Sequence, residues 1–147
     1  MKVLHNILGG LAGAVALNIV HEVAKRISND APHIDAVGKE AMAETIEFAG
    51  HEAPQGNSLT AVTLASDIAS NAAFYSLIGL GKESNLVPRG AIYGLAVGLT
   101  TLGGASVLPL DDAPLTKTTA TKIMTVGWYV IGGIVAGALI SRLREEY

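Results

Sequence analysis

The stretch SLTAVTLASDIASNAAFYSLIGL, residues 58–80, decides the fold, because it is an apolar segment with one acidic residue near its middle. A helix of about 20 residues rises about 30 Å, which matches the hydrocarbon core of a bilayer. We therefore predict a transmembrane helix here, with Ser58 as its N-cap and Asp67 near the bilayer midplane. Its polar residues share one face at helical spacing: Thr60, Thr63, Asp67 and Asn71. That face must turn toward other helices or water rather than lipid.

The composition of the whole chain favours a membrane protein. Its 147 residues leave room for one domain, and 50% of them are hydrophobic. The 17 glycines concentrate in apolar segments, as in closely packed membrane helices. A net charge of −3 gives no basic surface, so nucleic-acid binding is not expected. The absence of cysteine excludes disulfides, thiolate metal sites and thiol catalysis.

Three further apolar segments predict three further membrane helices, at about 3–27, 88–108 and 118–143. The predicted fold is therefore an all-α integral membrane bundle of four transmembrane helices in a single domain, 1–147. The second and third of these helices are joined by a short link, so we expect them to be antiparallel neighbours. An even number of spans places both termini on one side, but five basic residues fall on each side and assign no orientation.

The first apolar segment also has features of a secretory signal. A lysine precedes it, and Ala14-Val15-Ala16 has the form of a cleavage site. However, His5, Asn6 and three glycines weaken its apolar region. We therefore expect an uncleaved membrane helix.

A shorter amphipathic helix is predicted over about 34–49, between the first two membrane helices. Its polar face is acidic, with Glu40, Glu44, Glu47 and His51 within a narrow arc. Interfacial helices usually carry Lys and Arg opposite their apolar face. We therefore expect this helix to dock against its own bundle or a partner, with its carboxylates in water.

The same acidic face contains weak candidates for metal ligands, Glu44, Glu47 and His51. Di-iron bundles use a Glu-x-x-His spacing from each of two helices, whereas this chain has one Glu with the longer spacing to His51. His21-Glu22 lacks the second histidine of an H-E-x-x-H zinc motif. A solvated face explains the acids more simply, so we predict no metal site, and the sequence indicates no particular cofactor.

The last turns of the first helix carry an interfacial polar cluster on one face: Asn18, His21, Glu22 and Lys25. One interpretation is a ligand or proton site. The other is a set of groups paired with each other and with lipid headgroups, since charged side chains near helix ends extend to the interface.

Glycines recur every four residues in three of the predicted membrane helices. Such faces let helix backbones approach closely, either within one bundle or between chains. These glycines are Gly9 and Gly13, then Gly90, Gly94 and Gly98, then Gly133 and Gly137.

Two classes of function remain, because no phosphate-binding, dinucleotide or catalytic motif is present and no enzyme activity is predicted. The first is a structural or accessory subunit, or a homo-oligomer, whose glycine-rich helices contact other copies or other membrane subunits within the lipid bilayer. The second is a proton, ion or solute transporter or channel that uses Asp67, with Asn71, Thr63 and His21 along a hydrated path. The arrangement looks like that of many small bacterial membrane proteins, so we expect a bacterial inner or plasma membrane.

Overall fold

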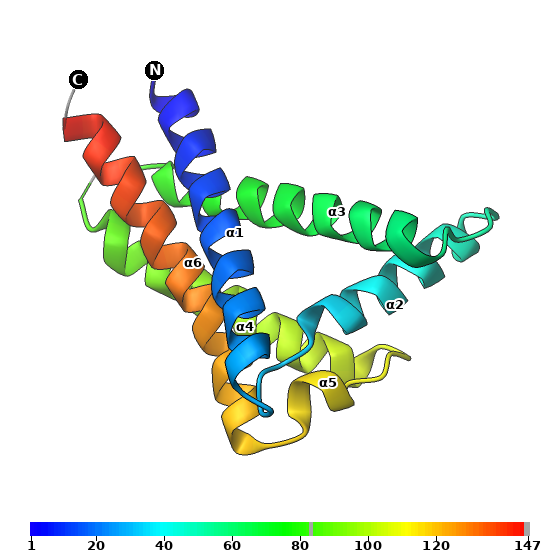
Figure 1. Ribbon diagram of the computed structural model, residues 1–147. Coiled ribbons are helices and arrows are strands. Elements are labelled where there is room, and N and C mark those ends of the chain that lie inside the picture. The colour runs from blue at the N-terminus through cyan, green and yellow to red at the C-terminus, as the bar shows by residue number, and fades with distance from the viewer. Residues whose placement is uncertain (83, 146–147) are drawn as a thin grey trace.

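The computed structural model describes residues 1–82 and 84–145, and this part of the chain is helical without strands (Figure 1). Three of its helices are long and apolar enough to cross a membrane, namely α1 (Lys2–Ile27), α4 (Leu86–Val107) and α6 (Thr119–Glu145). The other elements are α2 (Ile34–Phe48), α3 (Gly56–Ser76), the 3₁₀ turn η1 (Leu77–Gly79) and the short α5 (Ala113–Thr116).

α3 differs from the span predicted over 58–80. It begins at Gly56 with Gln55 in the N-cap position, so the assignment of Ser58 as N-cap was wrong. The helix thus begins two residues before Ser58, and the Thr60 hydroxyl donates a hydrogen bond to the Gly56 carbonyl at 3.2 Å in this first turn. α3 is not among the three membrane-length apolar helices, because its Ser, Thr, Asn and Asp residues lower its hydropathy.

α6 packs between α1 and α4, and glycines make these contacts close. A Cβ added to Gly90 would lie 2.0 Å from the Gly133 carbonyl oxygen, and a Cβ added to Gly133 would lie 2.0 Å from the Gly90 carbonyl oxygen. A Cβ on Gly94 would lie 2.2 Å from the Tyr129 oxygen, and one on Gly13 would lie 2.5 Å from the Gly132 oxygen. Only glycine fits where backbones approach this closely.

All seven glycines predicted to lie on packing faces contact other helices of the same chain. Gly9 faces Ile140, Gly98 faces Val126, and Gly137 faces the Leu86 carbonyl. These faces are therefore occupied within one molecule.

The expectation that 58–80 and 88–108 are close neighbours was wrong over most of their length. α3 packs mainly on α1, and Figure 1 shows it running across α1 and away from α4. α3 and α4 meet near their link, where the rings of Phe74 and Tyr93 are 5.3 Å apart. The reason is that the glycine edge of α4 fits α6, which leaves α3 to pack on α1.

Arg89 of α4 fixes the link between α3 and α4. Its guanidinium donates hydrogen bonds to the main-chain carbonyls of residues 78, 80, 82 and 84, at 2.8 to 3.3 Å. Its fixed array of donors thus holds the main chain of the link through four carbonyls.

α2 docks against its own chain through its N-terminal half. Val37 packs in a small core with Ala105 and Leu115. Glu40 accepts the Asp111 backbone N–H at 3.0 and 3.2 Å. The C-terminal half of α2 runs toward the N-terminal end of α3 (Figure 1), and Phe48 at its end is 95% exposed.

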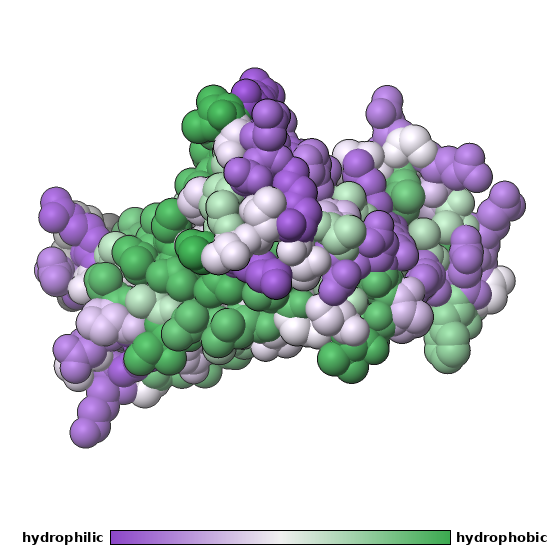
Figure 2. All heavy atoms as spheres, turned by 90° about the horizontal axis from the view of Figure 1, so that it is seen from below, coloured by the Kyte–Doolittle hydropathy of each residue, from purple (hydrophilic) through white to green (hydrophobic). Residues whose placement is uncertain are grey.

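The surface is strongly apolar along the helices. Figure 2 shows a hydrophobic area over the left and middle of one face, with hydrophilic residues at the left edge, on the projection at the upper middle and mixed with apolar residues over the right part. On α1 the exposed apolar side chains follow one helical face: Val3, Leu4, Ile7, Leu8, Leu11, Val15, Ile19, Val23 and Ile27. A surface of this kind suits lipid better than water.

Candidate functional site

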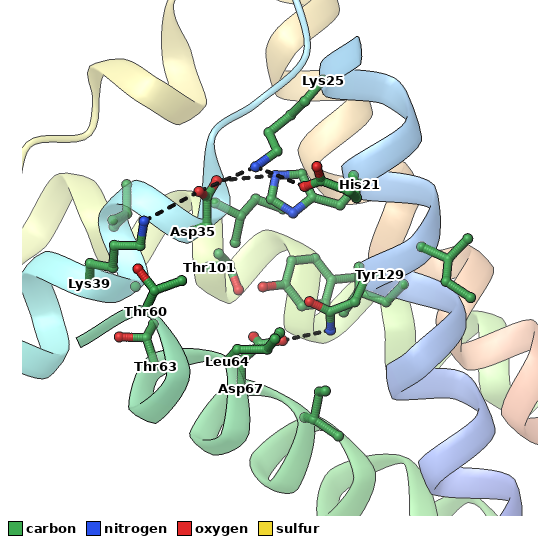
Figure 3. A pocket seen from close by; sticks show the side chains of 18 of the residues that line it. His21, Lys25, Asp35, Lys39, Thr60, Thr63, Leu64, Asp67, Thr101 and Tyr129 are labelled. Atoms are coloured by element: carbon green, nitrogen blue, oxygen red, sulfur yellow. Dashed lines mark hydrogen bonds and ion pairs between the residues drawn. The ribbon is translucent and has the colours of Figure 1, made fainter. Parts of the chain in front are cut away.

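An open cavity of about 590 Å³ lies between α1, α2 and α3, and we call it the Asp67 cavity (Figure 3). Along α1 its lining extends from Lys25, in the last turns, to Val15, near the middle of the helix. Thr101 of α4 and Tyr129 of α6 also line it. The site exists because α3 crosses α1 and diverges from it, while α2 closes the far side of the resulting triangle (Figure 1).

Asp67 lies half-buried at the inner end of this cavity and is held by two amides. Asn18 Nδ2 donates to Asp67 Oδ2 at 2.8 Å, and Asn71 Nδ2 donates to Asp67 Oδ1 at 2.9 Å. Each amide nitrogen also donates to a main-chain carbonyl at 3.0 Å, that of Ala14 or that of Asp67 itself. The second bond fixes each amide with its nitrogen toward the carboxylate, because a flipped amide would place two oxygens together.

Asp67 has no ion-pair partner among the residues that the structure describes. Each carboxylate oxygen accepts one amide hydrogen bond, while a carboxylate offers about four lone-pair directions in all. Acceptor capacity therefore remains on the cavity side.

The hydrogen bond between Asn18 and Asp67 joins two groups of residues that were predicted from the sequence as separate clusters. Asn18 belongs to the predicted interfacial cluster, and Asp67 belongs to the predicted polar face of α3. His21, Glu22 and Lys25 line the same cavity nearer the end of α1. The two predicted clusters therefore form one continuous site.

Ion pairs surround the polar end of the cavity. Lys25 Nζ lies 3.1 Å from Glu22 and 3.3 Å from Asp35, and Lys39 Nζ lies 3.9 Å from Asp35. His21 Nε2 lies 2.9 Å from the Pro32 carbonyl oxygen, so the ring is fixed against the loop after α1. The charges here balance one another, in contrast to Asp67.

Asp35 illustrates this balance. Burial acts to raise the pKa of Asp35, but the charge and hydrogen bond of Lys25, supported by His21, outweigh it and hold the pKa below its ordinary value. Asp35 is therefore an ionised member of a paired cluster.

Hydroxyl groups supply further polar contacts in the cavity. Thr63 is 7% exposed, and its Oγ1 is buried without a hydrogen-bond partner in the described part of the chain. It lies one turn from Asp67 on the same face of α3. Figure 3 shows the hydroxyls of Thr101 and Tyr129 pointing toward each other at the back of the cavity.

Among the polar residues of this site, the sequence analysis missed Lys39, Thr101 and Tyr129, and it also missed the apolar residues that line the cavity. Tyr129 carried a signal, because it lies too far inside the predicted last helix for an interfacial aromatic belt. Lys39 and Thr101 carried none, since their positions follow from the docking of α2 and the packing of α4.

The weak metal candidates are not assembled into a site. No group of three or more His, Asp or Glu side chains in residues 1–82 and 84–145 is arranged to hold a metal ion. Glu44 and Glu47 are exposed on the C-terminal half of α2, and His51 is exposed in the loop that follows it. The solvated-face interpretation of these acids fits their exposure.

Comparison with known proteins gave no match: no family model, no curated protein and no solved structure is significantly similar to the chain.

Proposed function

We propose that this is an integral membrane protein that takes up a cation into the Asp67 cavity as the loading step of transport. In this proposal α1, α3, α4 and α6 are the four membrane helices of one bundle. α3 has 21 residues, and its polar face lines the cavity while Val62 is exposed on another face. A helix with one polar face and one apolar face suits a position in the bilayer beside a hydrated cavity.

The observation that carries the proposal is a half-buried carboxylate at the inner end of an open cavity, with no basic partner among the described residues. Near the bilayer midplane an isolated charge is costly, so ionisable groups at this depth are usually paired or functional. Asp67 has two amide donors and no described basic partner, which leaves a place for a cation or proton.

The closed inner end of the cavity favours a transporter over a channel. Beyond Asp67, toward the N-terminus of α1, the helices touch. A Cβ on Gly10 would lie 2.2 Å from the Ala72 carbonyl oxygen, and Tyr75 is fully buried with its hydroxyl bonded to the Tyr129 carbonyl at 2.8 Å. A cavity that is closed at its inner end and accessible elsewhere is the geometry of one state of an alternating-access carrier.

Cysteine labelling would test access to the cavity, because the chain has no cysteine of its own. We expect Thr60→Cys, at the cavity wall, to react with a membrane-impermeant maleimide in liposomes. We expect Ile92→Cys, 65% exposed on the outer face of α4, to be shielded by lipid. Equal labelling at the two positions would contradict the proposal.

Flux measurements would test transport itself. Wild-type protein in liposomes should move protons or sodium ions above the protein-free background, and Asp67→Asn should abolish this flux while the protein stays folded. Glu44→Gln is the matched control, since Glu44 is an exposed acid of α2 outside the cavity. Flux of neither ion above background would refute transport of these two ions.

The accessory-subunit hypothesis remains a prediction. Its motivating glycine faces are in contact within the chain, so they supply no free surface for a partner. This hypothesis would gain support if Gly94→Leu changed the oligomeric size while the monomer stayed folded.

A further inference from the structure

We propose that the Asp67 cavity binds a primary ammonium compound with an apolar body, with the ammonium at Asp67 and the apolar part between α1 and α3. The proposal rests on the proposed function, because it takes the cavity to be the loading site. It goes further by naming the chemical class of the ligand.

The size of the cavity argues for an organic ligand. A proton or a bare metal ion would leave most of its 590 Å³ unfilled. Cavities of about 300–1,000 Å³ are typical of sites that bury small organic molecules. The ligand therefore has a body as well as a charged group.

The charges of the cavity argue for a cation. Its lining contains two lysines and three acids, with His21 as the remaining titratable group that changes charge near neutrality. Glu22 and Asp35 pair with the lysines, so the excess negative charge is that of Asp67. A ligand with one positive charge neutralises it.

The hydrogen-bonding groups argue for a primary ammonium. Asn18 and Asn71 each donate to one oxygen of Asp67, which fixes the carboxylate plane and leaves acceptor directions unused. The buried Oγ1 of Thr63, one turn away, is a second acceptor without a partner. An ammonium with three N–H donors can use the acceptor directions left on Asp67, whereas a quaternary ammonium has no N–H to donate.

The walls beside Asp67 argue for an apolar body. Val15 and Ile19 of α1 face the cavity together with Leu64 and Ile68 of α3. Val15, Ile19 and Leu64 are also 39%, 57% and 47% exposed, so the cavity opens between α1 and α3 on an apolar side. In a bilayer that side meets lipid, where amphiphilic amines concentrate.

The direct test compares three probes of similar shape on the intact protein in phosphatidylcholine nanodiscs. The probes are tritiated 2-phenylethylammonium, the neutral 2-phenylethanol and the anionic 3-phenylpropanoate, and empty nanodiscs correct for partition into lipid. We expect saturable binding of the ammonium at least about tenfold tighter than binding of the other two probes. Equal binding of the ammonium and the alcohol, or no saturable binding of either, would overturn the proposal.

Variants locate the binding. Asp67→Asn should weaken ammonium binding by about tenfold or more and leave the alcohol within about twofold. Thr63→Val, which removes only the hydroxyl, should weaken it by a smaller factor and serves if Asp67→Asn does not fold. Glu44→Gln should bind as wild type does, and an equal loss in Glu44→Gln and Asp67→Asn would overturn the proposal.

Competition identifies the source of the ammonium. If phosphatidylethanolamine added to the nanodiscs displaces the probe, the ligand is a lipid headgroup with the same primary ammonium chemistry. If it does not, the ligand is a free amine. Ammonium binding without any flux would refute transport but keep the site, whereas Asp67-dependent proton flux without ammonium binding would refute this inference and keep the proposed function.

Discussion

The close approach of α4 to α6 yields a quantitative prediction for Gly94→Ala. The added methyl would lie 2.2 Å from the Tyr129 oxygen, 2.6 Å from the Val130 Cα and 2.7 Å from the Tyr129 carbonyl carbon. All three atoms are backbone, so no side chain can rotate away. Since ordinary contact begins at 3.4 Å, α4 must move from α6 by about 1.2 Å, the difference between 3.4 and 2.2 Å.

The expected cost follows from two opposing effects. Overpacking of this kind costs about 1–3 kcal/mol, and the rigidity of the backbone favours the upper half of that range. Replacing glycine by alanine inside a helix returns up to about 1 kcal/mol. We therefore expect Gly94→Ala to lower the free energy of unfolding by about 1–2 kcal/mol.

Gly103→Ala is the matched control, because it lies in the same helix and its Cβ would meet nothing within 4 Å. Its free energy of unfolding should rise by up to about 1 kcal/mol, because only the higher helix propensity of alanine acts there. Reversible unfolding of both variants in one mixed-micelle system, followed by circular dichroism, would measure the difference. Equal stability of the two variants would refute the reasoning from interhelical distance.

The remaining predictions concern individual contacts. Tyr75→Phe removes a buried hydrogen bond to a main-chain carbonyl of α6 and should cost about 0.5–1.5 kcal/mol in the same unfolding measurement. The pKa of Asp35 is lower in the folded than in the unfolded protein, so its ion pair with Lys25 stabilises the fold at pH values above the unfolded-state pKa. This stabilisation is lost as the pH falls through the folded-state pKa. Asp35→Asn should therefore lose less stability than wild type between about pH 5 and 2. In Arg89→Lys the shorter set of donors cannot reach all four carbonyls of the link between α3 and α4, so amide hydrogen exchange near Leu80 should become faster. Unchanged exchange would show that Arg89 does not hold this link.

The helices themselves were predictable from the sequence, because their length and apolar content are local properties. The amphipathic helix was predicted over 34–49 and is observed over Ile34–Phe48, since Pro32 and Gly50 mark its ends. The four-helix count in a membrane remains a prediction, and the mixed composition of α3 is the reason that three rather than four helices meet the length and hydropathy expected of a span.

The arrangement of the helices was not predictable in the same way. The glycine spacings indicated close contacts but did not specify partners, so the pairing of α4 with α6 depended on surfaces far apart in sequence. The same limit applied to the site. Asn18 and Asp67 were each recognised as polar groups on membrane helices, but only the crossing of α1 and α3 places them 2.8 Å apart.

The position of α6 has a consequence for biosynthesis. α6 contacts both α1 and α4, yet the ribosome makes it after both of them. In the proposed membrane bundle, Gly13 and Gly94 have no backbone to face until α6 is inserted, and α1 is made about a hundred residues before this partner. Chains truncated before α6 therefore leave unpaired glycine surfaces in the bilayer, and we expect membrane quality-control proteases to remove them.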